Sequence, residues 1–192
     1  MQQSLSRAAV GAMLILSIGA INACSDNDDP VSPSDVTTQV INSIQNDSHI
    51  MGVLHESNVG EVQAGQLAVQ RASDAEVKAF AAMMVADHTT LDVTGTALAT
   101  QLGITPAVPN TVLPSQQDRE MSQLSLVTGN SFDKNYIAQQ VVAHTRTLAI
   151  VDAAIPEAQQ AALRTLLQSQ VRVRVAAHLA QAQQIASRIG NP

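Results

Sequence analysis

The chain has 192 residues, of which 45% are hydrophobic and only 2% aromatic, and it contains no tryptophan. A core built from Ala, Val, Leu, Ile and Met favours closely packed helices over a β-sandwich, and the length suits one globular domain with an accessory segment. Ten Lys and Arg residues against sixteen Asp and Glu residues give a net charge of −6, with no basic run, so we expect no nucleic-acid partner.

The first 23 residues have the pattern of an export signal. A single basic residue, Arg7, precedes an apolar run over residues 8–20, which is too short to span a membrane. The run leads to INAC, which resembles the lipobox of bacterial lipoproteins, in which the cysteine is lipidated and becomes the new N-terminus. We therefore expect residues 1–23 to be a lipoprotein-type signal peptide and Cys24 to carry a lipid.

The resemblance to lipoproteins also implies a location. An Asp directly after the lipidated cysteine retains such proteins in the inner membrane, whereas here Ser25 follows. The expected destination is the outer membrane, with the domain facing the periplasm and the lipid anchor as the contact with the membrane. The alternative is an ordinary cleaved signal and a soluble periplasmic protein. Residues 24–36 are acidic and contain Pro and Ser, which is typical of a flexible tether.

From residue 37 to residue 190 the chain reads as successive helices. The tetrapeptide SDAE at 73–76 has the form of a capping box, so one helix ends near Ala72 and the next begins directly with Ser73 as its cap. Gly103 and three following prolines end this second helix and begin a long connection, which contains a short helix within SQQDREMSQLSLV.

Two more long helices follow this connection. The third covers residues 130–155 and is ended by Pro156, which can itself be the first residue of the fourth. The fourth runs to about Arg188.

Three of these helices carry one histidine on an otherwise apolar face. On the second helix His88 lies four residues after Met84 and three before Leu91, which places it on the side that faces the core. The third and fourth helices repeat the pattern with His144 and His178, and the first long helix places a carboxylate, Glu61, among small residues. The four long helices thus present four inward-facing polar groups.

The topology determines whether these groups meet. With a rise of 1.5 Å per residue, Glu61 and His88 lie roughly 18 and 22 Å from the turn at Ser73. In a simple up-down-up-down order His178 would lie roughly 33 Å from the end shared with this turn, a layer away from the others. If the long connection crosses the length of the bundle, His144 and His178 both lie roughly 15–20 Å from that end. A connection of nearly thirty residues suits a crossover, which predicts an all-α, ferritin-like four-helix bundle.

Several segments resemble a known family. GEVQAGQLAVQRASDAEVKAFAAMMVADHTTL, FDKNYIAQQVVAHT and AAHLAQAQQI are similar to the ferritin-like exported bacterial proteins known as domain of unknown function 4142. The resemblance extends from about Ser48 to Ile189. It implies an exported helical bundle without an established activity, and the residues that match the family's recurrent polar positions are Glu61, Asp87, His88, His144 and His178.

The sequence departs from di-iron bundles in its carboxylates. Such bundles use Glu-x-x-His on two helices, but here Val85 and Val175 stand three residues before His88 and His178. Ferroxidase and iron-storage activities are therefore disfavoured, while a mononuclear site for Zn, Cu, Ni or Fe remains open. The candidate ligands are Glu61, His88, His144 and His178.

A metal-free interpretation stands beside this one. Buried histidines are commonly held by hydrogen bonds, and Glu61 could accept from one or more imidazoles. Asp87 faces about 100° away from its neighbour His88, so it is expected to be solvated or to orient a ligand. No phosphate loop, nucleophile elbow or cysteine nucleophile is present, so we assign no catalytic residue. The two hypotheses are a lipid-anchored metal-binding bundle of the envelope and a structural or protein-interaction module.

Overall fold

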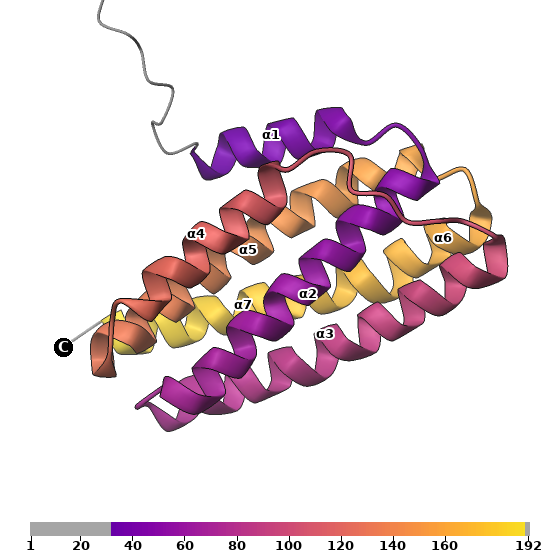
Figure 1. The fold of residues 1–192 in the computed structure, drawn as a ribbon. Helices are drawn as coiled ribbons and strands as arrows, with labels where there is room; N and C mark the ends of the chain where they lie inside the picture. Colours follow the sequence, from indigo (N-terminus) through magenta and orange to yellow (C-terminus); the bar gives the residue numbers. More distant parts are fainter. Residues whose placement is uncertain (1–31, 191–192) are drawn as a thin grey trace, which may run out of the picture. The chain divides into compact units, whose positions relative to one another are not determined.

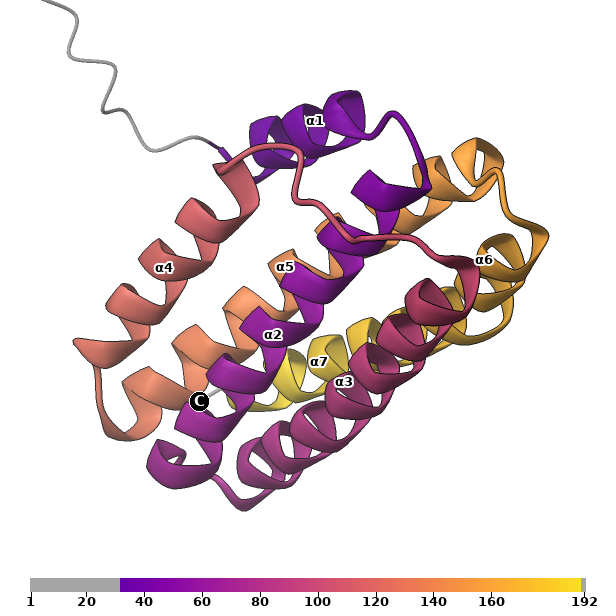
Figure 2. The same ribbon diagram turned by 45° about the vertical axis from the view of Figure 1, so that its right-hand side comes forward.

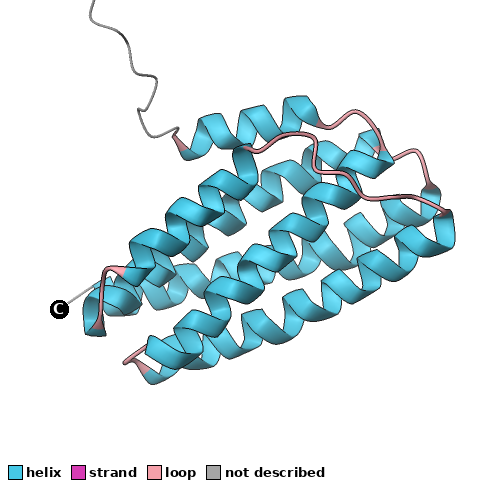
Figure 3. Cartoon of the chain, viewed as in Figure 1, coloured by secondary structure: helices cyan, strands magenta, loops and turns pink. Residues whose placement is uncertain are grey.

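A computed structural model describes residues 32–190, and these form helices joined by turns and one long connection (Figure 3). The prediction of an all-α fold is confirmed for this part of the chain. The expected signal peptide, the expected lipidation site at Cys24 and most of the expected tether lie outside the described residues. Within the described part, no helix combines the length and apolar character that spanning a membrane requires.

The helices are named in chain order, with η1 denoting a π-helical turn that joins its two neighbours without a break. Their bounds are α1 Pro33–Ser43, α2 Asp47–Arg71, α3 Ala75–Leu102, α4 Val112–Ser125, α5 Gly129–Glu157, α6 Ala161–Leu166, η1 Leu167–Val171 and α7 Arg172–Gly190.

The long helices form two antiparallel pairs that lie side by side, α2 with α3 and α5 with α7 (Figures 1 and 2). In the turn after α5, the backbone N–H groups of Gln159 and Gln160 donate to Asp47 at the start of α2, at 2.8 and 2.9 Å. The turn between α2 and α3 lies instead at the start of α5, where Asp133 accepts from the Ser73 N–H. These turns are at opposite ends of the helices, so α2 and α7 run in the same direction.

The segment 103–128 connects the two pairs. Gly103 ends α3 with a φ of 65°, in the left-handed region that favours glycine. The loop then passes the start of α2, where the Ala107 N–H donates to the Ser48 carbonyl at 3.0 Å, and α4 runs along α2 and α5 to the other end (Figure 1). The segment therefore traverses the length of the helices. The assignment to a ferritin-like four-helix bundle stays a prediction.

The N-terminal ends of α1 and α3 differ from those expected. Helix α1 begins at Pro33, inside the range expected for the tether, because Ser32 accepts the Asp35 N–H and proline suits the first helical turn. Helix α3 is capped by Asp74 rather than by Ser73, with the Asp74 carboxylate accepting two N–H groups of the first turn. The Asp74 side chain, one position closer to the helix, thus takes the capping role that was expected of Ser73.

The helices after residue 110 also begin or end at other residues than predicted. Helix α4 starts at Val112, a few residues before the expected short helix. Pro156 lies in the last turn of α5, which continues to Glu157, and it does not begin the next helix. Pro156 lacks the N–H that would donate to the Asp152 carbonyl, but only Glu157 follows it in the helix, so the loss is confined to the last turn.

The apolar helix faces that the sequence predicts form two main clusters along the long helices. One cluster lies towards the turn at Ser73 and includes Phe80, Met84 and Tyr136, and the other lies towards the α5–α6 turn and includes Leu91 and Val151. Burial of each large apolar side chain contributes about 1.5–3 kcal/mol. The polar groups on the inward faces lie between these clusters, in one layer: Glu61, His88, His144 and His178.

Candidate metal centre

Three histidines from three helices meet in this layer. His88 on α3, His144 on α5 and His178 on α7 are 3%, 1% and 3% exposed, so all three are buried. The centre of the His88 ring lies 5.6 Å from that of His144 and 5.3 Å from that of His178, and the remaining pair is 5.4 Å apart. One ligand nitrogen of each ring lies within 4.8 Å of those of the other two.

Each imidazole is held by a hydrogen bond through one of its nitrogens. His88 Nδ1 donates to the side-chain oxygen of Asn58 at 2.9 Å, and His144 Nδ1 donates to the backbone carbonyl of Gln140 at 2.9 Å. His178 Nε2 donates to a carboxylate oxygen of Asp87 at 2.8 Å. These acceptors select the tautomer of each ring, because a neutral imidazole carries one N–H.

The second nitrogen of each ring has no hydrogen-bond partner among the described residues. These atoms are His88 Nε2, His144 Nε2 and His178 Nδ1, and each is buried. With the tautomers given above, each carries a lone pair rather than a proton. Three buried acceptors on neighbouring rings therefore lack a hydrogen-bond donor within residues 32–190, although an unsatisfied buried polar atom costs about 1–3 kcal/mol.

The separation of the rings matches coordination of a single ion. With metal–nitrogen bonds of about 2.0–2.1 Å, the centre of each imidazole ring lies about 3.2 Å from the metal. Three such rings are about 5.2 Å apart around a tetrahedral ion and about 5.5 Å apart around a trigonal planar ion. The observed separations of 5.3–5.6 Å agree with these values to within about 0.1 Å. Small rotations of the rings would bring the three nitrogens to bonding distance.

The electrostatic environment keeps His88 and His178 uncharged. Burial lowers the pKa of His88 well below its ordinary value, and the nearby His144, His178 and Arg174 lower it further. Burial also lowers the pKa of His178, although its hydrogen bond to Asp87 acts in the opposite direction. Neutral imidazole is the form that ligates a metal, so these two rings are in the ligating state at neutral pH.

Glu61, the fourth residue predicted as a ligand, lies next to the three histidines but faces another partner. Its carboxylate accepts from the Gln140 side-chain amide at 2.8 Å, and its other oxygen is 3.8 Å from His144 Nδ1, the nitrogen that already donates to a carbonyl. The group of mutually close ligand atoms consists of His88, His144 and His178, without Glu61. Glu61 therefore lies next to Nδ1 of His144 and not next to its free Nε2.

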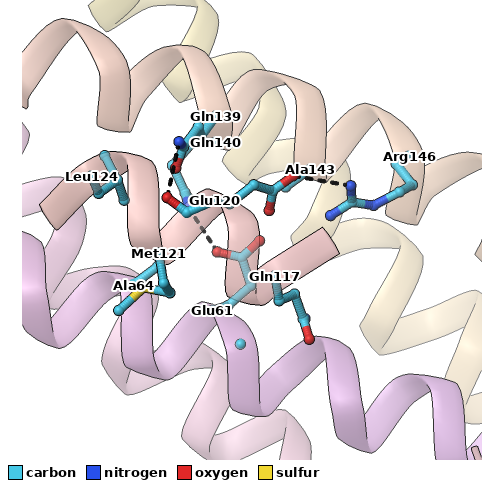
Figure 4. A pocket seen from close by; sticks show the side chains of 11 residues that line it. Glu61, Ala64, Gln117, Glu120, Met121, Leu124, Gln139, Gln140, Ala143 and Arg146 are labelled. Atoms are coloured by element: carbon cyan, nitrogen blue, oxygen red, sulfur yellow. Dashed lines mark hydrogen bonds and ion pairs between the residues drawn. The ribbon is translucent and has the colours of Figure 1, made fainter. Parts of the chain in front are cut away.

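Glu61 belongs instead to a small polar pocket between α2, α4 and α5 (Figure 4). In this pocket Arg146, which is 5% exposed, pairs with Glu120 at 3.2 Å, and Gln140 approaches the Glu61 carboxylate. The space inside is about 30 Å³, enough for one or two water molecules. The pocket thus surrounds Glu61 with hydrogen-bonding groups and one cation.

Asp87 contacts the histidine of another helix rather than its neighbour in the sequence. Its carboxylate faces away from His88, as expected from the angle between adjacent helical residues, and accepts from His178 on α7. Two further supporting residues, Asn58 and Gln140, were not predicted from the sequence. Gln140 stands four residues before His144, so its carbonyl is the one that a histidine side chain on the same helix can reach. Asn58 stands one turn before Glu61, and that spacing is a signal for its inward position.

A family model described as Domain of unknown function (DUF4142) matches residues 33–185, so the chain belongs to this family, as the sequence motifs predicted. Comparison with curated proteins gave no match, and comparison with solved structures gave none either. The three-histidine site is therefore the feature of the chain that bears on its function.

Proposed function

We propose that this member of the family binds one transition-metal ion through His88 Nε2, His144 Nε2 and His178 Nδ1. The observation that carries the proposal is the meeting of three buried imidazole rings, each fixed through one nitrogen and each with a second, buried nitrogen that has no partner in the described part of the chain. This is the arrangement of metal-binding histidines, whose second nitrogen donates to a carbonyl or carboxylate that orients the ring.

The donor set restricts the metal. Three neutral imidazoles suit Zn, Cu, Ni or Fe, whereas Mg²⁺ and Ca²⁺ prefer oxygen ligands. Three protein ligands from three helices leave a tetrahedral ion one further coordination position. Glu61 is no longer included among the ligands, since its carboxylate already accepts from Gln140 and lies behind His144.

The metal-free alternative explains the site less well. A hydrogen-bonded network requires a donor for each acceptor, but the three facing nitrogens are all acceptors in the tautomers that Asn58, Gln140 and Asp87 select. Glu61 could join such a network only by accepting an imidazole proton, and the nearest imidazole nitrogen is 3.8 Å from it. A bound cation satisfies all three lone pairs at once.

Metal analysis and thermal melts of the full protein, purified without a histidine tag, test the proposal. We expect one equivalent of metal per chain and a melting temperature that rises with Zn²⁺ or Cu²⁺ and falls with a chelator, because the ion binds only the folded state. His144→Ala should weaken the metal affinity by more than about 100-fold. His55→Ala is the matched control, since the His55 side chain is 51% exposed and pairs with Asp92. If no metal copurifies and none shifts the melt of the wild type, the site is a metal-free polar layer.

We further propose that the domain acts in the bacterial cell envelope, held at the outer membrane by a lipid on Cys24. The support is the N-terminal sequence, with an apolar run followed by INAC and then Ser25. The proposed role is binding, with no catalytic residue assigned. Cys24→Ser should release the protein from membranes in cell fractionation, and mass spectrometry of the wild type should find acyl chains. A wild type without acyl groups that fractionates like the variant would refute the anchor.

A further inference from the structure

The three groups that orient the histidines differ in their access to solvent. Asn58 and Gln140, which hold His88 and His144, are 8% and 3% exposed, so these two rings are fixed deep inside the protein. The Asp87 side chain, which holds His178, is 37% exposed. His178 is therefore the one of the three rings whose supporting group reaches the surface.

The helices around the histidine layer also leave the side next to Asp87 uncovered. Helix α1 packs on α4 and α5, and α4 packs on α2 and α5, so the two helices cover the side of the layer that carries Glu61 and Gln140. Figures 1 and 2 show α3 and α7 on the other side, with no other helix of the described chain lying over them. A path from solvent to the three histidines past Asp87 would cross only the contact between α3 and α7.

The polar pocket at Glu61 is the competing route, but none of the three histidines is among its lining residues. Arg146 in this pocket pairs with Glu120, and Glu61 adds a second carboxylate, so position rather than charge argues against this route. The Glu61 carboxylate in this pocket lies 3.8 Å from His144 Nδ1, the nitrogen that donates to a carbonyl and is not a proposed ligand. An ion held in this pocket would therefore not yet be in contact with the ligand nitrogens.

We infer that the metal ion enters between α3 and α7, where the carboxylate of Asp87 attracts the hydrated cation and the ring of His178 moves aside to admit it. This inference rests on the proposed three-histidine site. Breaking the single hydrogen bond between His178 and Asp87 frees the His178 ring to rotate out of the layer, which exposes the free nitrogens of His88 and His144. Asp87 is thus a capturing and positioning residue and not one of the final ligands.

Stopped-flow binding of Co²⁺ tests this route, because the visible absorption of Co²⁺ reports its coordination directly. Asp87→Asn keeps an oxygen acceptor for His178 but removes the charge. We expect its association rate constant to fall about three- to tenfold at low ionic strength, with the dissociation rate nearly unchanged. Added NaCl should slow association to the wild type more than to the variant, because salt screens the attraction by Asp87.

Two further variants separate capture from other effects. Asp92→Asn removes a carboxylate from the same helix, one that pairs with His55, and should leave Co²⁺ association unchanged. Asp87→Ala also removes the acceptor of His178, so it should additionally raise the dissociation rate. If Asp87→Asn associates at the wild-type rate with the same salt dependence, or if it changes only dissociation, the entry route is wrong although the site stands. If the wild type itself gives no Co²⁺ spectrum, the proposed metal site fails first.

Discussion

The carboxylate of Asp133 on α5 accepts the backbone N–H of Ser73 at 3.0 Å, although sixty residues separate the two in the chain. It also accepts the N–H of Asp74 at 2.9 Å, and Asp133 is only 3% exposed. This contact ties the turn between α2 and α3 to the start of α5. It holds the starts of α3 and α5 at the same end of the molecule, and so it supports the position of His88 and His144 in one layer.

Asp133→Ala should destabilise the protein by about 1–3 kcal/mol, because it removes a charged acceptor that two backbone N–H groups share. Urea unfolding followed by circular dichroism measures the change. Asp133→Asn keeps one acceptor oxygen and should lie between the wild type and the alanine variant. Asp118→Ala serves as the surface control and should change the free energy of unfolding by less than about 0.5 kcal/mol. Equal stabilities of the wild type and Asp133→Ala would contradict this role.

Two glycines inside helices should respond to alanine in opposite ways. A methyl group on Gly52 of α2 would overlap the backbone of Ala107, where the long connection passes, so Gly52→Ala should lose about 1–3 kcal/mol. Gly95 of α3 has open space around the same position, so Gly95→Ala should gain up to about 1 kcal/mol from helix propensity. Thermal melts of the pair measure both effects. A Gly52→Ala variant with the stability of the wild type would mean that the long connection does not pack closely against α2.

The stability of the metal-free protein should fall on acidification. The pKa of His88 is lowered in the folded state, so below its ordinary value of 6.5 the unfolded chain binds a proton that the folded chain does not. The contribution is complete above that value and is lost as the pH falls below it, by up to about 1.4 kcal/mol per pH unit for one group. Urea unfolding between pH 7.5 and about pH 5 with a chelator present measures the slope, and His88→Gln should reduce it. An unchanged slope in His88→Gln would assign the dependence to other groups.

Glu61→Gln should leave metal binding nearly intact. The variant removes a carboxylate that faces Gln140 and not the free imidazole nitrogens, so we expect the affinity to change by less than about tenfold. His88→Ala, in the same calorimetric titration, should lose far more. If Glu61→Gln abolishes binding as completely as His88→Ala does, Glu61 moves to the metal on binding and the ligand set predicted from the sequence is right.

Apolar periodicity predicted the helices and the inward direction of His88, His144 and His178, because the period of a helix alone determines which residues share a face. The long connection predicted that the turns lie at opposite ends, since its length exceeds that of a tight turn. The hydrogen-bond partners of the three imidazole rings could not be predicted from periodicity or loop length. Whether Glu61 meets an imidazole or the amide of Gln140 depends on small rotations of neighbouring helices, which periodicity does not report. The π-helical turn over residues 167–171 likewise has no local sequence signal.

Anomalous diffraction from crystals of the metal-loaded protein tests the three-histidine site most directly. Data collected on both sides of the absorption edge of the bound metal locate the ion without reference to activity. We predict one peak between α3, α5 and α7, within about 2.0–2.1 Å of His88 Nε2, His144 Nε2 and His178 Nδ1. A peak at the carboxylate of Glu61 in the polar pocket, or no peak in the histidine layer at full loading, would contradict the proposed site.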